Sequence, residues 1–151
     1  MAHHRAAVCV ENGAPLQIQA RNTPMPGPGE LLIQIHSVAL NPADYIMRDT
    51  GLFVPTYPAI IGFDLSGLVV DVGEGVPVEP SHDNAASVFQ PGITRVAAYG
   101  AGVWRAGQPD YGAFQEMCLV PWQHAVRLPE GNMSFNQAAT LPVAVQVALN
   151  A

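Results

Sequence analysis

The chain has 151 residues, of which 49% are apolar and 12% charged, and its formal net charge is −6 at pH 7. This length suits one domain, and the apolar content excludes an intrinsically disordered chain. All six basic residues are scattered arginines. A Schiff-base or phosphate-loop lysine therefore does not exist here, and no nucleic-acid or anionic-membrane surface is expected.

Two features predict where the protein works. Residues 1–5 lack the apolar core of a secretion signal, and no apolar run approaches the ~18–20 residues of a membrane span. Cys9 and Cys118 lie in apolar, strand-like contexts, which favours buried free thiols in a reducing compartment. We therefore expect a cytoplasmic protein.

The first half of the sequence predicts short strands and one short helix. Residues 5–10 and 16–20 form a predicted hairpin around a turn at 11–13, and residues 30–40 alternate as a half-buried strand should. Asn-Pro-Ala-Asp at 41–44 predicts a helix start, with a cap, a proline at the first position and an early acid. Residues 60–73 predict a turn and then a long strand.

The second half continues this pattern and then changes. Residues 76–90 are rich in Pro, Ser, Asn and acids, which predicts an exposed loop, and further strands are predicted at 95–99, 113–121 and 126–128. Short strands separated by turns indicate a small barrel or sandwich. A capping box at Ser134 and Gln137 predicts a helix to Thr140, and Pro142 breaks or restarts it before an apolar end that must pack against something.

Four segments together resemble the medium-chain dehydrogenase/reductase superfamily. They are Asn-Pro-Ala-Asp at 41–44, Gly-Phe-Asp-Leu-Ser-Gly-Leu-Val-Val-Asp-Val-Gly at 62–73, Gly-Ala-Phe-Gln-Glu-Met-Cys-Leu-Val-Pro at 112–121, and residues 128–148. They look most like the zinc-independent branch, which includes quinone oxidoreductases and the fungal trans-acting enoyl reductases of polyketide secondary metabolism. The resemblance implies a mostly β fold: a GroES-like (chaperonin-10-like), partly open barrel with short helices and a C-terminal helical tail.

The resemblance also implies a domain division and a cofactor. Residues 1–133 would form the substrate-binding and catalytic barrel, and residues 134–151 a helical connector that leads toward a Rossmann domain. No Gly-x-Gly-x-x-Gly motif occurs, so the Rossmann domain is expected to be absent. The family implies NADPH, but we expect this chain alone to bind no cofactor. Zinc-dependent relatives place a Cys and a His where this chain has Asn41 and Phe63, so no metal is expected.

In the resembling enzymes the segment around Asn41 lines the cleft where nicotinamide and substrate meet. There Asn41 would hydrogen-bond a carbonyl and Tyr45 would donate to, or stack on, the substrate. Asn41 and Asp44 also have a plain alternative as helix caps, and Asp64 as a carboxylate bonded to Arg48 or to backbone N–H groups. The candidates are Asn41, Asp44, Tyr45 and Asp64 as catalytic residues, Phe53, Tyr57, Phe63 and Trp104 as substrate-binding residues, and Thr140 and Gln146 as cofactor-binding residues if a Rossmann domain is supplied.

Three functions stay open. The first is the substrate-binding catalytic domain of an NADPH-dependent enoyl or quinone reductase-like oxidoreductase, not redox-competent as the 151-residue chain. The second is a stand-alone domain that isomerises or cyclises a polyketide-like intermediate without a cofactor. The third is a non-catalytic interaction partner, and a homodimer is compatible with it and with the second. The expected ligand is a small, apolar, unsaturated carbonyl compound.

Overall fold

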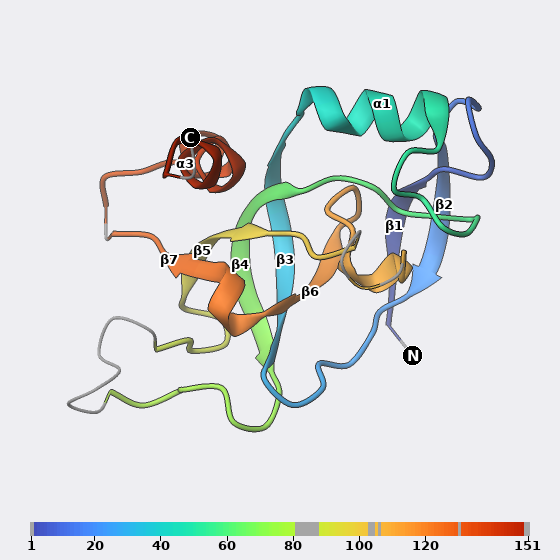
Figure 1. Cartoon of the computed structure of the whole chain (residues 1–151). Helices are drawn as coiled ribbons and strands as arrows, with labels where there is room; N and C mark the ends of the chain where they lie inside the picture. The colour runs from blue at the N-terminus through green and yellow to red at the C-terminus, as the bar shows by residue number, and fades with distance from the viewer. Residues whose placement is uncertain (1, 81–87, 103–104, 106, 130, 150–151) are drawn as a thin grey trace.

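The computed structural model describes residues 2–80, 88–102, 105, 107–129 and 131–149. Within these residues the chain folds mainly into β-strands, with short helices between and after them (Figure 1). In chain order the elements are β1 (His3–Val8), β2 (Gln17–Asn22), β3 (Glu30–Ala39), α1 (Pro42–Thr50), β4 (Asp64–Val72), β5 (Arg95–Tyr99), the 3-10 helix η2 (Pro109–Tyr111), β6 (Met117–Pro121), the 3-10 helix η3 (Trp122–His124), β7 (Ala125–Arg127), α2 (Phe135–Ala139) and α3 (Pro142–Leu149).

The strands form a five-stranded antiparallel sheet and a separate hairpin. The large sheet has the order β6-β3-β4-β5-β7, and the hairpin pairs β1 with β2. The free edge of β1 meets the segment before β6, where the Ala7 N–H donates to the Phe114 carbonyl at 2.8 Å. Register shifts in β3 next to Ile33 and Ser37 add local bends. The result is a curved, partly open barrel, which confirms the predicted fold class.

The core fills the inside of this curved sheet. Leu31, Leu32 and Ile33 are buried in succession, although the sequence predicts alternation there. The reason is that both faces of β3 are covered at its start: Leu31 and Ile33 face the main core, and Leu32 packs with Tyr111 and Leu119 on the other side. The buried residues of the main cluster are Leu31, Ile33, Leu65, Val69, Val76, Phe89, Val96, Ala98, Ala113, Cys118 and Val120.

Two expectations from the sequence are wrong in detail. The predicted strand at 113–121 begins only at Met117, because the residues before it bond to two different segments: the Phe114 N–H donates to Ile61 and the Glu116 N–H to Arg5. The predicted exposed loop at 76–90 is buried at both ends, since Val76, Val88 and Phe89 fill the core. Apolar residues at the ends of a polar segment therefore return it to the barrel. Residues 81–87 lie outside the described part.

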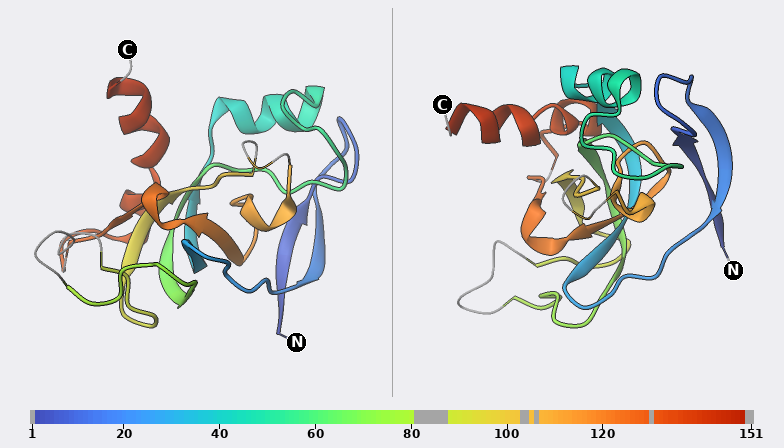
Figure 2. Two further views of the ribbon diagram at one scale, coloured as in Figure 1. Left: turned by 60° about the horizontal axis from the view of Figure 1, so that its bottom comes forward. Right: turned by 45° about the vertical axis from the view of Figure 1, so that its right-hand side comes forward.

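The helices start where the sequence predicts. The capping box is confirmed: the Gln137 N–H donates to the Ser134 Oγ at 3.2 Å, and the Ser134 N–H donates to the Gln137 side chain at 3.0 Å. α2 packs on the sheet, whereas none of the eight residues of α3 is buried and the helix projects from the barrel (Figure 2). Pro142 does restart the helix. In the described residues no helix is long and apolar enough to cross a membrane.

Candidate functional site

Three chain segments that are far apart in sequence meet at the carboxylate of Asp64. This residue begins β4 and is only 2% exposed. Its Oδ2 accepts a hydrogen bond from the Asn41 side-chain amide at 3.2 Å, and its Oδ1 accepts one from the Val143 N–H at 2.9 Å. Asn41 caps α1, and Val143 lies in the first turn of α3. We call Asn41, Asp64 and Val143 the junction.

A second buried carboxylate lies beside the junction. The Asn41 backbone N–H donates to the Asp44 Oδ2 at 2.7 Å, and the Asp44 Oδ1 is buried with no hydrogen-bond partner among the described residues. Burial raises the pKa of Asp44, and the neighbouring charge of Asp64 raises it further. Burial likewise raises the pKa of Asp64. Two neighbouring buried acids thus carry shifts that favour their neutral forms.

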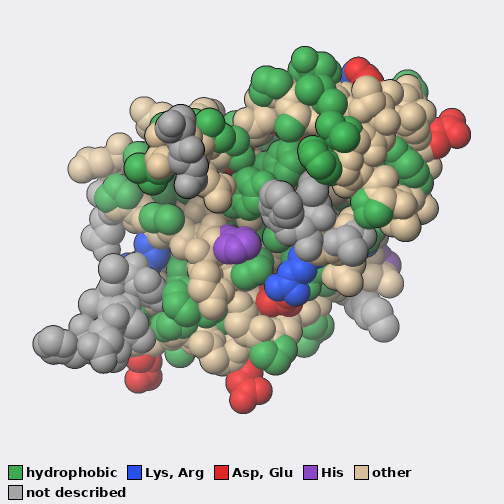
Figure 3. All heavy atoms as spheres, viewed as in Figure 1, with side chains coloured by type: hydrophobic (Ala, Val, Ile, Leu, Met, Phe, Trp, Pro, Cys, Tyr) green, Lys and Arg blue, Asp and Glu red, His purple; other side chains and the backbone are tan. Residues whose placement is uncertain are grey.

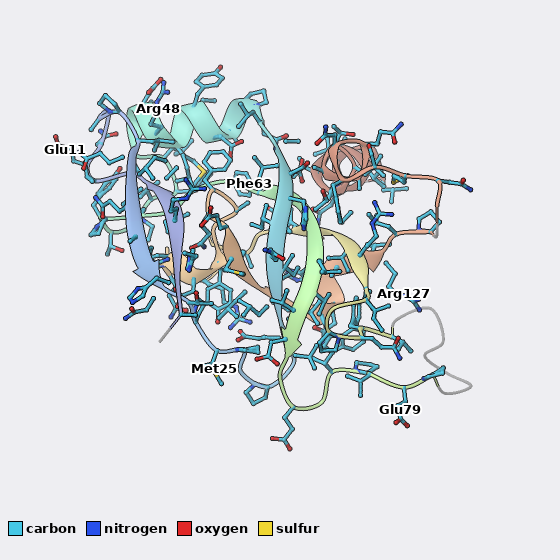
Figure 4. All side chains as sticks on the ribbon, turned by 180° about the vertical axis from the view of Figure 1, so that it is seen from behind. Glu11, Met25, Arg48, Phe63, Glu79 and Arg127 are labelled. Atoms are coloured by element: carbon cyan, nitrogen blue, oxygen red, sulfur yellow. The ribbon has the colours of Figure 1, made fainter. Side chains whose placement is uncertain are left out.

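Arg48 does not contribute to this site, so the proposed bond between Arg48 and Asp64 is wrong. The Arg48 Nε donates to the adjacent Asp49 at 2.6 Å, in the last turn of α1 (Figure 4). Asp49 is the next residue in the chain, so the guanidinium reaches it easily. Asp64 lies near the opposite end of the nine-residue helix. The other structural alternative, a backbone N–H, is the one observed at Asp64.

The structure places the other candidate catalytic residue, Tyr45, on the surface. Tyr45 lies four residues beyond Asn41 and is 56% exposed, so it is not part of the packed core. Residues four apart lie on the same side of a helix. The phenol of Tyr45 is therefore available to a ligand that approaches the start of α1.

The three aromatic candidates that the structure describes do not line one common pocket. Phe63 is buried beneath α1, where its ring stacks on Tyr99 at 5.6 Å between centroids (Figure 4). Phe53 is 64% exposed with φ at 63°, and Tyr57 has a buried hydroxyl without a partner among the described residues. Trp104 lies outside the described residues. Of the candidates described, only Phe63 lies next to the junction, because it precedes Asp64 and packs in the same cluster as Val143.

A large apolar groove adjoins the junction. Its volume is about 610 Å³, and it lies between β5, β7 and α3. Tyr99, the partner of Asp64 in the β4–β5 register, and Pro142, which precedes Val143, both line it. Apolar side chains also gather on the outside of α3 (Figure 3). Among the residues that line the groove are Tyr99, His124, Val126, Leu141, Val145 and Leu149.

The sequence did not predict the residues of this groove apart from Gln146. Gln146 lines it, as its assignment near a nicotinamide would allow, whereas the Thr140 hydroxyl donates to the Gln137 carbonyl at 2.8 Å within the end of α2. Tyr99 and His124 meet edge to face, with 6.4 Å between their centroids. The signal that could have found the groove is the apolar sequence of α3, whose side chains from residue 144 onward are exposed.

The starts of α1 and α3 do not fit the phosphates of a dinucleotide. A helix start binds phosphate through free N–H groups, often after a glycine-rich loop. Here the chain's own carboxylates already lie at the starts of α1 and α3, as Asp44 and Asp64. The part of the chain that the structure describes also contains no group of three His, Cys, Asp or Glu side chains arranged for a metal ion.

The partly open antiparallel barrel with short helices is the fold of a GroES-like domain. Residues 27–130 match the family model of the alcohol dehydrogenase GroES-like domain, and the chain belongs to this family. The resemblance to the medium-chain dehydrogenase/reductase superfamily is thereby confirmed.

Among the proteins similar to this chain is a fungal enzyme. The chain is 42% identical to trans-enoyl reductase tazE of Aspergillus terreus over 151 residues, which cover 99% of this chain and 47% of that protein. Human synaptic vesicle membrane protein VAT-1 homolog-like protein superposes with a TM-score of 0.79 at 26% identity, over 98% of this chain and 42% of that one. A mycobacterial protein solved as a complex with NADPH gives 0.66 at 25% identity, over 87% and 34%. The chain thus spans less than half of these relatives.

Proposed function

We propose that this chain is the substrate-binding part of an enoyl or quinone reductase-like oxidoreductase, and that it binds a small, apolar, unsaturated carbonyl compound. The observation that carries the proposal is the Asn41 amide, which donates to Asp64, whose partner in the sheet, Tyr99, lines a groove of about 610 Å³. Tyr99 and Pro142 line this groove and adjoin the junction. A polar donor beside an apolar groove is the usual composition of a small-molecule site.

The chemistry follows from the hydrogen-bonding capacity of the amide. A side-chain amide carries two hydrogens, and the bond to Asp64 uses one of them. The other can donate to a carbonyl oxygen and draw electron density away from a conjugated double bond. Tyr45, exposed on the same side of α1, would supply a second donor. The apolar part of the ligand would lie in the groove, where burial contributes about 25 cal/mol per Å².

The relatives support this assignment. The name trans-enoyl reductase describes an enzyme that acts on an unsaturated substrate, and a mycobacterial relative binds NADPH. In this chain, carboxylates already lie at the starts of α1 and α3, where dinucleotide phosphates would otherwise bind. The role that we propose for this chain is therefore to bind and polarise the carbonyl, without a redox step of its own.

The test is a calorimetric titration of the protein with a trans-2-octenoyl thioester of N-acetylcysteamine. Replacing Asn41→Ala should weaken binding about tenfold, the effect of one hydrogen bond. Asn22→Ala, at an exposed position at the end of β2, is the matched control and should bind as the wild type does. The corresponding thioether, which lacks the carbonyl, should bind equally to wild type and Asn41→Ala. Equal thioester affinity for wild type and Asn41→Ala would contradict the proposal.

Analysis of the recovered ligand separates this function from the cofactor-free alternative. We expect the thioester to be recovered unchanged, with or without added NADPH. An isomerised or cyclised product without nicotinamide would favour an isomerase or cyclase instead. Oxidation of NADPH by the 151-residue chain would contradict the role without a redox step.

A further inference from the structure

We propose that Asp64 is a positioning residue that makes the orientation of the Asn41 amide depend on the position of α3. This inference rests on the proposed function, because it explains how the donor is held toward the ligand. Asp64 is 2% exposed and cannot itself reach a ligand in the groove. It acts through Asn41 and is not a catalytic residue.

The two oxygens of Asp64 have different partners on different elements. One oxygen accepts from Asn41 at the start of α1, and the other accepts from Val143 in the first turn of α3. A carboxylate is planar and rigid, so a shift of one partner turns the plane that the other partner faces. Since an ionised carboxylate only accepts, it also fixes the amide of Asn41 with its nitrogen inward. Asp64 thus connects Asn41 and Val143, which are 102 residues apart in the sequence.

Among the described residues around Asp64, none competes with it for the side chain of Asn41. No residue of α3 is buried, so the bond to Val143 is a main point at which the start of this helix meets the barrel. The partners of Asp64 in the sheet are Ala39 on β3 and Tyr99 on β5, and neither is a cation. Neither α2 nor α3 contains a charged residue. Asp44 is the neighbouring charge, and its bond goes to the backbone of Asn41 and not to its side chain.

This arrangement predicts that a ligand bound in the groove also affects the orientation of the Asn41 amide. Leu141, Val145 and Leu149 on and next to α3 line the groove, so a ligand there contacts the same helix that Asp64 connects to Asn41. A ligand that seats α3 against the barrel would therefore also hold Val143 at Asp64, and through it the amide in its donating orientation.

The test uses nuclear magnetic resonance of the full 151-residue chain without ligand, with two signals: the side-chain amide of Asn41 and the hydrogen exchange of the Val143 amide. Asp64→Ala should move the Asn41 signal and speed Val143 exchange about tenfold, because both bonds are lost together. Asp64→Asn keeps the volume and has one acceptor, so at least one of the two signals should change. This variant decides the matter if Asp64→Ala does not fold.

Asp44→Asn is the matched control, since it neutralises the adjacent buried carboxylate but leaves both bonds of Asp64 in place. It should leave Val143 exchange unchanged. The positioning role would be overturned if the Asn41 and Val143 signals stayed as in the wild type in the folded Asp64 variants.

A second measurement separates this inference from the proposed function. In folded Asp64→Ala, the affinity for the 2-octenoyl thioester should fall about tenfold although Asp64 does not touch the ligand. If the wild type fails to bind the thioester but shows both signals coupled, the proposed function fails and the connection stands. If the wild type binds the thioester but the two signals do not depend on Asp64, the proposed function stands and the positioning role of Asp64 fails.

Discussion

Two regions of this molecule bury carboxylates, and they do so in opposite ways. Glu30, at the start of β3, accepts from the Tyr111 hydroxyl at 2.6 Å and from the Gly27 N–H at 2.9 Å, and Arg105 lies 3.8 Å away. Asp44 and Asp64, at the starts of α1 and β4, have no arginine beside them among the described residues, and one oxygen of Asp44 has no partner.

The difference indicates which region is structural. Both oxygens of Glu30 are used and a cation offsets its charge, so its bonds hold the segment before β6 to the barrel. Burial, with Glu30 as a further cause, raises the pKa of Tyr111 to about 12, which keeps its hydroxyl a donor. Burial raises the pKa of Asp64 in the junction and of Asp44 beside it, so the fixed Asn41 amide comes at a cost in stability.

The largest loss of stability should follow a substitution at Glu30, where both carboxylate oxygens are hydrogen-bonded. Glu30→Gln has one acceptor for two donors, so either Tyr111 or Gly27 meets an amide nitrogen in a buried site. We expect the free energy of unfolding in urea to fall by about 1–3 kcal/mol. Glu79→Gln, at an exposed position, is the control. An unchanged midpoint for Glu30→Gln would remove the contrast between the two regions.

The equivalent change beside the junction should have a smaller effect on stability, of opposite sign. Asp44→Asn keeps an oxygen for the Asn41 N–H and replaces the unpartnered oxygen with a donor group, while it removes a charge beside Asp64. At pH 7 the free energy of unfolding should be equal to or higher than that of the wild type, within about 1 kcal/mol. A loss of stability as large as that of Glu30→Gln would show that the polar groups around Asp44 are as fully hydrogen-bonded as those around Glu30.

The pH dependence sharpens the same contrast. The pKa values of Asp44 and Asp64 are raised in the folded protein from an ordinary 3.8, so folding binds protons. Stability from these groups therefore rises as the pH falls from neutrality through the raised values, and levels off below 3.8. The difference between Asp44→Asn and wild type should shrink toward acid pH in urea titrations. A difference that stays constant or grows would be inconsistent with the raised pKa values.

The smallest effect on stability should be at Tyr45, outside both regions. Tyr45 is 56% exposed, so Tyr45→Phe should change the free energy of unfolding by less than about 0.5 kcal/mol. Loss of the second donor should weaken thioester binding about threefold, measured by calorimetry. Unchanged affinity would assign carbonyl recognition to Asn41 without Tyr45.

The short strands and helices could be predicted because their signals are local, whereas the choice of a barrel over a sandwich came from the family resemblance. Turns, the Asn41 cap and the Pro142 restart each depend on neighbouring residues, and they appear in the structure. Alternation appears in β3 only beyond Ile33, because both faces of the strand are covered at its start. Val88 and Phe89 were misread because a polar composition hid two residues that reach the core. The homodimer, the division near residue 133 and the roles of the site residues stay predictions.

The junction itself could not be read from local patterns. Asn41, Asp64 and Val143 come together only through the tertiary fold, and the donor at Val143 is a backbone group that no residue type reveals. The sequence did single out Asn41 and Asp64 as polar residues near the expected cleft. It could not show that one holds the other, or that the groove lies between β7 and α3.

The central claim, that Asn41 donates to a carbonyl in this groove, is tested most directly by following the Asn41 side-chain amide signal during titration with the 2-octenoyl thioester. We expect a saturable shift with the dissociation constant found by calorimetry, and no such shift with the thioether. A signal that does not move at ligand saturation would contradict it.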